Sequence, residues 1–267
     1  MNIRTYYVKT AKICFRTSWI SLIMAAAFFA LHLFGVLTGN ILEIEAPFIL
    51  FSIISFAGYR VYENRAQGLP IEAVTSCKPL EEQRNLLAAF MPAPTLRVLL
   101  FEPNGALAGE IRDMNMSWYM WMIPNSVSLI LPKRYGLYNS TGKLLGMYNF
   151  GWGLLNKVVM KDGEGQLIGS FKEVWKKSLF KVNGMIAGAG GEDWIPVSIG
   201  GLLNDFELIT CSGKKIVRFQ KGWMPIEWGE RFKEMNTPVL SFSEAAEMKE
   251  KVAVLGFCAA VLHHRKN

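Results

Sequence analysis

The segment VAVLGFCAAVL, residues Val252–Leu262, is the part of this sequence that says most about its fold. It holds eleven uncharged apolar residues, comes after the charged segment Ser243–Lys251 and is followed at once by the polar residues HHRK. At a rise of about 1.5 Å per residue, a helix of this length spans roughly 16 Å, about half of a bilayer core. A helix that is apolar on every side and too short to cross a membrane is buried by protein. We therefore expect a central helix over residues 243–263, enclosed by the rest of the chain. The residues predicted to pack there are Val252, Leu255, Phe257 and Val261.

An internal repeat upstream of this helix supplies the enclosing structure. Four segments share one pattern: an apolar run, a polar pair, a glycine, and a returning apolar run that carries a second glycine in three of the four copies. The turn glycines provide the positive φ of tight hairpins, and the second glycine lets a backbone or a large side chain approach closely. The copies are Leu99–Ile111, Gly136–Tyr148, Val159–Phe171 and Leu208–Phe219, with turn glycines Gly105, Gly142, Gly165 and Gly213, and with Gly109, Gly146, Gly169 and the exception Val217 at the second position.

These hairpins predict a closed sheet. With the further strands below, the chain has roughly ten to twelve strands, and a sheet of that size closes to protect its edges. Such a barrel is too wide for its own side chains to fill, and the apolar helix is the segment that fits its lumen. The predicted fold class is a β-barrel of about 12 strands over residues 95–267 that encloses the C-terminal helix. The further strands are expected at Trp118–Ile123, Ser126–Leu131, Leu179–Val182 and Val239–Phe242.

The first 66 residues are predicted to anchor the chain in a membrane by two spans, at about residues 17–37 and 43–60. Thr17–Leu37 is uncharged over 21 residues, which is long enough to cross a bilayer. A secretory signal peptide is the alternative, but the apolar core is longer than that of a typical signal and no small-residue cleavage site follows it. We expect a retained anchor.

The second span decides on which side of the membrane the body lies. Ala46–Tyr59 has fourteen uncharged residues, which is marginal for spanning. If it crosses, Lys and Arg residues lie before the first span and after the second, and none lies in the loop between them. By the positive-inside rule, both chain ends are then in the cytoplasm. If it only lies in the interface, the body is exported. We expect a two-pass protein of the cell (inner) membrane with its barrel in the cytoplasm.

Residues 67–94 are interpreted as a connector between the anchor and the barrel. Within it, Leu80, Leu87 and Met91 recur on one side of a helix, which predicts a short amphipathic helix over Leu80–Met91. The prolines that follow would end this helix.

Composition and charge exclude several classes of function. The chain has 267 residues, a net charge of +7 and 51% hydrophobic residues. Residues 1–66 hold six Lys and Arg against three Glu, and the rest holds 23 basic against 19 acidic residues, so the body is only mildly basic. This charge suits the surface of an anionic membrane and is too weak for a nucleic-acid partner. The four cysteines lie far apart without a CxxC pair, so we expect no metal, no cofactor and a reducing compartment.

No catalytic constellation can be assembled from the body. It has no histidine before His263, which excludes Ser-His-Asp and Cys-His arrangements, and the common nucleotide, protease and esterase motifs are absent. The carboxylate pairs Glu192–Asp193 and Asp205/Glu207 are the enzymatic alternative, but such pairs near turns are usually solvated. The glycine-rich run Asn183–Trp194 lacks the helix and lysine of a phosphate-binding loop and is interpreted as a hairpin tip. We expect a protein that is not an enzyme.

Three features of the sequence occur together: the repeated hairpins, the triplet Asn-Thr-Pro at Asn236–Pro238 that leads into Val239–Phe242, and the hydrophobic terminal helix. In this combination the chain resembles the tubby C-terminal-like barrel superfamily, which includes phospholipid scramblases and LURP-one-related proteins. The resemblance covers about Thr95–His264 and suggests a bacterial-type member with an N-terminal membrane hairpin. It implies a barrel of about twelve strands around a hydrophobic C-terminal helix. It implies less about function, because members bind phosphoinositides, act on lipids or have no known activity.

The expected function is binding of lipid headgroups, or of a protein partner, by a membrane-tethered barrel at the cytoplasmic membrane surface. A basic residue close to an anionic membrane gains about 1 kcal/mol. The alternative is a lipid-handling protein of the scramblase type, which the short and nearly uncharged membrane hairpin disfavours. The predicted lipid- or partner-binding residues are Lys133, Arg134, Lys176, Lys177, Lys214, Lys215, Trp223 and Trp228.

Overall fold

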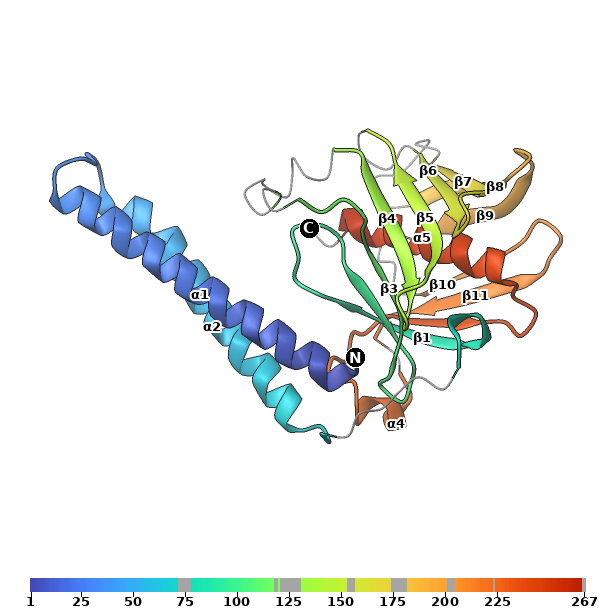
Figure 1. The fold of residues 1–267 in the computed structure, drawn as a ribbon, viewed down its shortest axis with the longest axis horizontal. Coiled ribbons are helices and arrows are strands. Elements are labelled where there is room, and N and C mark those ends of the chain that lie inside the picture. Colours follow the sequence, from blue (N-terminus) through green and yellow to red (C-terminus); the bar gives the residue numbers. More distant parts are fainter. Residues whose placement is uncertain are drawn as a thin grey trace. The chain divides into compact units, whose positions relative to one another are not determined.

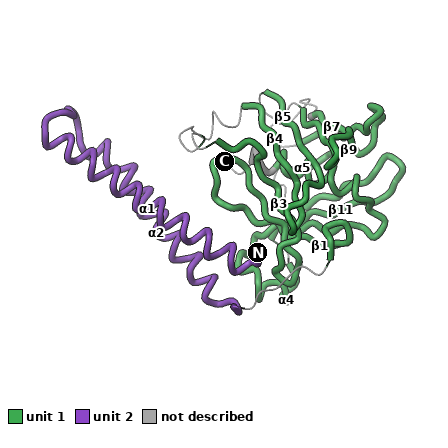
Figure 2. Tube along the Cα trace, viewed as in Figure 1, with its two compact units in different colours: residues 1, 74–267 green, residues 2–73 purple. Residues whose placement is uncertain are grey.

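Two compact units make up the chain: a helical hairpin over residues 2–73, and a body formed by residue 1 and residues 74–267 (Figures 1 and 2). The computed structural model describes residues 1–71, 78–117, 120, 131–152, 157–173, 182–200, 205–222 and 224–265, with side chains described through Val261.

The first unit consists of the antiparallel helices α1 (Ile3–Leu33) and α2 (Ile41–Gln67). Small polar side chains connect the helices: Ser18 Oγ donates a hydrogen bond to Ser52 O at 3.0 Å, and Ser52 Oγ donates to Ser18 O at 3.0 Å. Serines at a helix contact allow close approach and hydrogen bonding, as is typical of helices that pack in a membrane.

Both helices are long and apolar enough to cross a membrane. Only 17% of the most hydrophobic window of α1 and 6% of that of α2 are buried within the protein. The helices extend beyond the predicted spans, since α1 begins at Ile3 and α2 ends at Gln67. Packing of aromatic rings near these ends explains the extension: the ring of Tyr62 lies 6.5 Å from that of Tyr6 and 6.2 Å from that of Tyr7.

In the described residues the body is a single antiparallel sheet of twelve strands, as predicted. Successive strands pair with one another except β9 and β10, and β1 pairs with β12, so the first strand joins the last. The two edges β9 and β10 also meet, where Cys211 N donates a hydrogen bond to Trp194 O at 2.9 Å, which makes the barrel nearly closed. The strands are β1 Asn85–Phe90, β2 Val98–Phe101, β3 Leu107–Asp113, β4 Lys133–Asn139, β5 Leu144–Phe150, β6 Val158–Asp162, β7 Leu167–Glu173, β8 Val182–Gly188, β9 Asp193–Ile199, β10 Asp205–Ile209, β11 Lys215–Gln220 and β12 Val239–Phe242.

Five hairpins of the barrel use the same turn. In each, the turn glycine N–H donates to the carbonyl three residues earlier, and the strand register shifts by a bulge beside the turn. The φ values of Gly105, Gly142, Gly165 and Gly213 are 82°, 85°, 90° and 84°, which confirms all four predicted turn glycines. Gly191, with φ 87°, belongs to the fifth hairpin, which the sequence repeat did not reveal.

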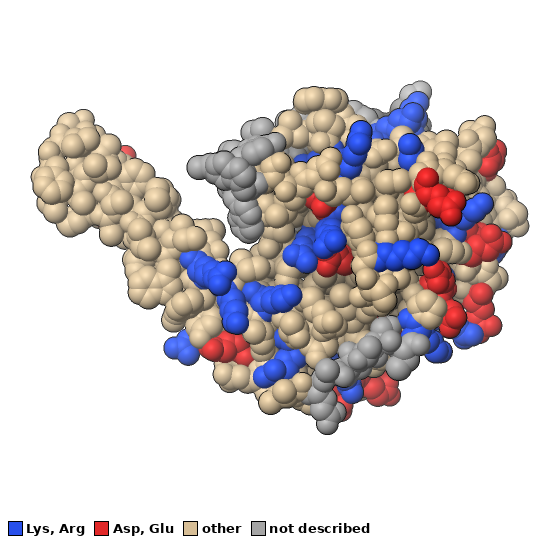
Figure 3. All heavy atoms as spheres, in the orientation of Figure 1, with Lys and Arg blue, Asp and Glu red and all other residues tan. Residues whose placement is uncertain are grey.

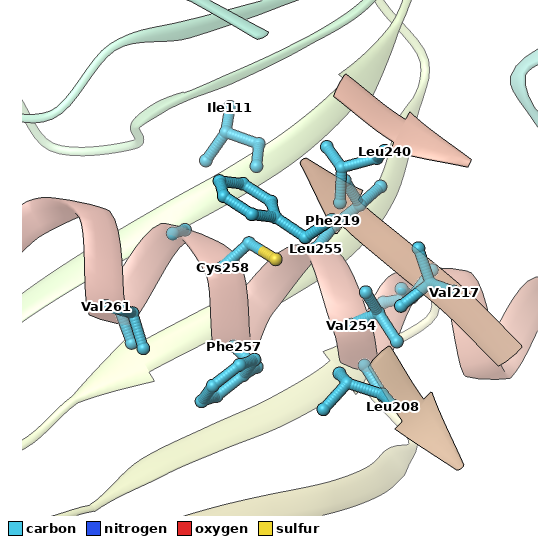
Figure 4. Packing of buried hydrophobic residues seen from close by; sticks show 14 of the residues in the cluster. Ile111, Leu208, Val217, Phe219, Leu240, Val254, Leu255, Phe257, Cys258 and Val261 are labelled. Carbon is cyan, nitrogen blue, oxygen red and sulfur yellow. The ribbon is translucent and has the colours of Figure 1, made fainter. Parts of the chain in front are cut away.

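The C-terminal helix α5 (Met248–Arg265) lies inside the barrel, as predicted (Figures 1 and 4). Its apolar residues from Val252 to Val261 are at most 4% exposed, and Leu255 and Phe257 are 1% and 0% exposed. The ring of Phe257 packs edge-on against Phe171 at 4.9 Å. Each large apolar side chain buried this way contributes about 1.5–3 kcal/mol, so α5 is a principal part of the core.

Two glycines let α5 and β5 approach closely, which confirms the predicted role of the second glycine at Gly146. A Cβ atom added at Gly146 would lie 2.6 Å from Val252 Cγ1, and one added at Gly256 would lie 2.5 Å from the ring of Tyr148. Tyr148 also donates a hydrogen bond from its hydroxyl to Val252 O at 2.9 Å. One strand thus fixes the position of the helix along the barrel axis.

The helix begins at Met248, later than the predicted residue 243. Ser243–Ala246 instead forms a turn, with Ala246 N donating to Ser243 O at 3.1 Å. The side chain of Glu250 then reaches back, and its Oε2 accepts a hydrogen bond from Glu247 N at 2.7 Å. This contact satisfies an N–H that a helix start leaves without a partner, so the first turn forms here.

The predicted amphipathic helix over Leu80–Met91 is wrong. Only Leu80–Glu82 is helical, as the single 3-10 turn η1, and β1 follows between β2 and β12. Its side chains are buried on both faces of the sheet, with Leu86 in the central core and Leu87 0% exposed on the other face. Pairing with two neighbouring strands outweighs the helical preference of the segment LLAA, and the barrel therefore begins within the predicted connector.

The glycine-rich run Asn183–Trp194 is more than a hairpin tip. It provides most of β8 and the start of β9, which pair over six residue pairs. The predicted strand Val239–Phe242 is β12. The predicted strands Trp118–Ile123 and Ser126–Leu131 lie almost wholly outside the described residues, and Leu179–Val182 is described only at its last residue, where β8 begins.

The segment between β11 and β12 covers part of the outer face of the barrel. It contains the short helix α4 (Ile226–Gly229) and then Phe232. The ring of Phe232 packs edge-on against that of Phe101 from β2 at 6.1 Å, and both side chains are at most 2% exposed. This contact explains why β2 is buried on both faces.

Candidate functional site

A hollow of about 780 Å³ opens at one end of the barrel. It lies where β3 ends, β4 begins and β5 ends, so three neighbouring strands contribute side chains to it. We call it the rim pocket. Its lining residues are Asp113, Asn115, Met120, Leu131, Pro132, Lys133, Arg134, Asn149, Phe150 and Trp152.

Lys133 is a buried cation in the wall of the rim pocket, only 6% exposed. Burial lowers the pKa of its ammonium group because the charged form loses hydration, and the negative charge of Asp113 opposes this shift. Asp113 is positioned by the turn after β3, where its Oδ1 accepts a hydrogen bond from Asn115 N at 2.9 Å. A titratable group perturbed by burial beside an opposite charge is typical of sites that bind charged ligands.

Arg134 and Trp152 form the accessible side of the rim pocket. Arg134 is exposed, and no ion pair to it is found within the part of the chain that the structure describes. Trp152 is 70% exposed, which is unusual for so large an aromatic side chain. Phe150, which also lines the pocket, packs its ring edge-on against Tyr135 at 5.0 Å. Tyr135 belongs to the barrel core, so this side of the pocket is continuous with the core.

The opposite end of the barrel is occupied by internal polar contacts. Lys214 Nζ bonds to both carboxylate oxygens of Glu250 at 2.9 and 2.8 Å. Lys251 Nζ donates to Glu81 O and, at 2.8 Å, to Gln83 O. Burial lowers the pKa of Lys251, and the charge of Glu81 opposes that shift. These contacts fix the start of α5 to the barrel and serve structure.

The structure places the predicted basic residues in different surroundings. Lys133 and Arg134 line the rim pocket. Lys214 is engaged with α5, and Lys215 Nζ bonds to Glu207 Oε1 at 2.7 Å on the outer face of the barrel. Because Lys214 and Lys215 do not line the pocket and each has a carboxylate partner, the structure does not support a ligand-binding role for them.

The predicted aromatic residues do not join the rim pocket. Trp228 lies in α4, partly buried, and is not among the residues that line the pocket. Trp223, Lys176 and Lys177 lie outside the described residues. The four central-helix residues, in contrast, are all in the barrel core.

The two carboxylate pairs are placed as solvated or paired groups. Glu192 and Asp193 are exposed at the turn between β8 and β9. Asp205 accepts hydrogen bonds from Arg218, which lowers the pKa of its carboxyl group. Among the described residues, no group of three or more His, Cys, Asp or Glu side chains is arranged to hold a metal ion.

Charges of both signs are interspersed on the face of the body that Figure 3 shows. On the helical hairpin, the blue side chains gather toward one end and the remainder is almost entirely uncharged. The rim pocket is therefore distinguished by the burial of its lysine and not by a broad basic surface.

Sequence reasoning identified the two cations of the rim pocket but missed Asp113, Asn149 and Trp152. Asp113 ends β3, whereas Asn149 lies in β5 and Trp152 follows it, so the two sides of the pocket meet only through the pairing of β3 with β4 and of β4 with β5. The sequence signal that points to them is weak: an aromatic pair, Phe150 and Trp152, that alternates with glycines.

Comparison with known proteins yields a structural likeness at low sequence identity. No family model matches the chain, and no curated protein matches it. Among solved structures, it is similar to the X-ray structure of a protein from Arabidopsis thaliana, with 10% sequence identity over 71% of this chain and 97% of that chain, and with a TM-score of 0.45. The class of protein is defined by its own fold: a nearly closed twelve-stranded barrel around an apolar C-terminal helix, with two helices able to span a membrane.

Proposed function

We propose that this protein is a membrane-tethered barrel, without enzymatic activity, that binds an anionic lipid headgroup at the cytoplasmic surface of the cell membrane. The rim pocket carries the proposal. Its volume of about 780 Å³ accommodates a headgroup, and Lys133 and Arg134 follow one another in the strand that begins there. A phosphate in the pocket would gain charge-assisted hydrogen bonds from both cations, which are about twice as strong as bonds between neutral groups.

The tether makes such binding effective at modest affinity. The helical hairpin exposes apolar side chains along both helices, which favours a position in lipid. A barrel held near a membrane meets headgroups at a high effective concentration, so a weak site is occupied. The resemblance of the hairpin repeat to tubby-like barrels supports a lipid ligand, since that superfamily includes members that bind phosphoinositides or act on lipids.

A lipid-handling function of the scramblase type is the alternative. It requires polar groups along a path across the bilayer. Within α1 and α2, Ser18 and Ser52 bond across the helix contact, so they do not line such a path. Movement of labelled lipid between leaflets of vesicles that contain the full chain, above the rate of protein-free vesicles, would replace the binding proposal by this alternative.

The test uses the full chain in neutral detergent and short-chain phospholipids with anionic or zwitterionic headgroups. Tryptophan fluorescence follows binding, because Trp152 lies at the pocket. We expect the anionic lipid to bind, and Arg134→Gln to weaken binding about tenfold, the value of one charge-assisted bond. Lys143→Gln is the matched control, since Lys143 is exposed beyond the far end of the same strand. Equal affinities of wild type and Arg134→Gln for the anionic lipid would contradict the proposal. A chain that binds a protein partner and no anionic lipid would show that the pocket has another kind of ligand.

A further inference from the structure

A second cavity lies within the helical hairpin, between the charged ends of α1 and α2. It is a groove of about 540 Å³. Arg4, Lys12 and Arg16 line it from α1, and Tyr59 and Glu63 line it from α2. The three cations are eight and then four residues apart in the sequence, so they follow one another along the groove at intervals of about 12 and 6 Å. The anchor therefore presents a row of three positive charges along one groove.

Few internal groups neutralise these charges. No ion pair is found for any of the three cations in the described part of the chain. Arg4 Nε is buried and has no hydrogen-bond partner among the residues that the structure describes. Of the described residues that line the groove, Glu63 alone is a carboxylate, and its Oε1 already accepts a hydrogen bond from the hydroxyl of Tyr59 at 2.6 Å. The groove keeps a net positive charge and a buried donor that lacks an acceptor, which together favour an anionic ligand.

An aromatic cluster sets the depth of the groove in a membrane. The ring of Phe15 lies 6.2 Å from that of Trp19 and 5.1 Å from that of Tyr59, and Phe56 lies 5.7 Å from Tyr59. Aromatic side chains collect where the hydrocarbon of a bilayer meets its headgroups. The guanidinium group of Arg60 lies 5.5 Å from the ring of Phe56, so the charged end of the hairpin begins at the level of this aromatic cluster.

Below this cluster the hairpin surface is apolar. α1 has no charged residue after Arg16, and Trp19, Ile20 and Ile23 are 52%, 62% and 62% exposed. The basic groove thus borders an apolar surface of α1 that lies beyond the groove lining. A soluble anion would use only the groove, whereas a phospholipid matches both surfaces, with its phosphate among the cations and its acyl chains against the exposed apolar side chains.

We propose that this groove binds an anionic phospholipid, with its phosphate held by Lys12 and Arg16, while Arg4 adds positive charge at the far end of the same groove. The inference rests on the proposed insertion of the hairpin in a membrane and is independent of the rim pocket. The site would hold the hairpin at a defined depth and rotation, because the lipid contacts both helices at once.

The experiment extracts the full chain into detergent with a mixture of equal amounts of phosphatidylglycerol and phosphatidylcholine, and counts retained lipids by native mass spectrometry. We expect the wild type to retain phosphatidylglycerol preferentially. Lys12→Gln and Arg16→Gln should each reduce that preference about fivefold, since a basic residue near the headgroups contributes about that factor.

Lys9→Gln is the matched control. Lys9 lies on the same helix, is exposed as Lys12 is, and does not line the groove. It removes the same charge and should leave the preference unchanged, as should Arg134→Gln in the rim pocket. Equal losses for Lys9→Gln and Lys12→Gln would show a general charge attraction and overturn the proposal. Displacement of phosphatidylglycerol by millimolar inorganic phosphate would also overturn it, because the site would then recognise a soluble anion. Circular dichroism checks that the helix content is unchanged.

Discussion

The chain contains two kinds of apolar helix in opposite surroundings. α5 is enclosed by twelve strands, and its residues Leu255 and Phe257 are 1% and 0% exposed. α1 and α2 touch mainly one another, and Ile23 and Ile53 are 62% and 61% exposed. All three helices carry long apolar segments, but only α5 has its apolar surface removed from water by the protein itself.

The difference shows that length and covering surface, not apolar character alone, decide where a helix resides. The apolar part of α5 is too short to cross a bilayer, and the barrel requires a filler. The helices of the hairpin are long enough to span, and only 17% and 6% of their apolar windows are buried by the described residues. The same substitution should therefore have different consequences in the two regions.

The largest effect is expected for a charge placed in α5. Phe257→Asp would bury a carboxylate without a partner and lose the contact with Phe171, at a cost above about 3 kcal/mol, which prevents the barrel from folding. Near-ultraviolet circular dichroism of the full chain in detergent measures the loss of packed aromatic rings. The matched change Phe51→Asp in α2, where the side chain is 51% exposed, should weaken membrane insertion and leave the barrel signal intact. A cooperatively melting barrel in Phe257→Asp would contradict the enclosure of α5.

The contact between α5 and β5 predicts a smaller effect that a second substitution can reverse. Gly146→Ala places a methyl group against Val252 Cγ1 and should destabilise the barrel by about 1–3 kcal/mol. In the double variant Gly146→Ala/Val252→Ala that clash is gone, so the two changes should cost less together than the sum of their separate costs. Urea unfolding of the four proteins measures this coupling. Strict additivity would mean that the two residues do not touch.

Alkaline pH should reveal the buried thiol of α5. Burial raises the pKa of Cys258 to about 12 from an ordinary value of 9.0. The unfolded chain therefore releases the thiol proton at a lower pH than the folded chain, so stability falls as the pH rises above 9. At pH 10 the titration of this single thiol lowers the free energy of unfolding by about 1.4 kcal/mol. Cys258→Ala has no thiol, so its free energy of unfolding should fall by about that much less at alkaline pH. Urea midpoints at pH 7 and pH 10 measure the difference. An equal alkaline loss in both proteins would place Cys258 in contact with water.

The smallest effect is expected from the hydroxyl of Tyr148. Tyr148→Phe removes the hydrogen bond to Val252 O and keeps the ring, so the barrel should lose about 1 kcal/mol. The matched change Tyr138→Phe, on the neighbouring strand β4, removes a hydroxyl that does not contact α5 and should have less effect. Thermal melting of the two variants in detergent compares them, and equal melting temperatures would show that the bond to α5 contributes nothing.

Local chemistry explains why much of the fold can be predicted from the sequence. A glycine with positive φ is nearly obligatory in the shared turn, so Gly105, Gly142, Gly165 and Gly213 reveal four hairpins. The enclosed helix follows from a run of eleven residues without a charge. Both signals depend only on neighbouring residues.

The parts that sequence reasoning missed depend on distant partners. β1 consists of residues that favour a helix, and only its pairing with β2 and β12 makes it a strand. In β8, a Cβ atom at Gly184 would meet the ring of Phe171 at 2.6 Å, so glycine is required at this position. With glycines in place of larger side chains, β8 lacks the alternation of apolar and polar residues that usually reveals a strand. The pairs Lys133–Arg134 and Lys214–Lys215 look alike in the sequence, yet the first pair lines the rim pocket and the second forms ion pairs with Glu250 and Glu207.

One measurement tests the contrast between the two regions most directly. The full chain is placed in lipid nanodiscs with a phospholipid that carries a photoreactive diazirine on its acyl chain, and the cross-linked residues are mapped by mass spectrometry. We expect cross-links in α1 and α2, at exposed residues such as Ile23 and Ile53, and none between Val252 and Val261 of α5. Cross-links in α5 would show that lipid reaches this helix, and a hairpin without cross-links would show that it does not lie in the bilayer.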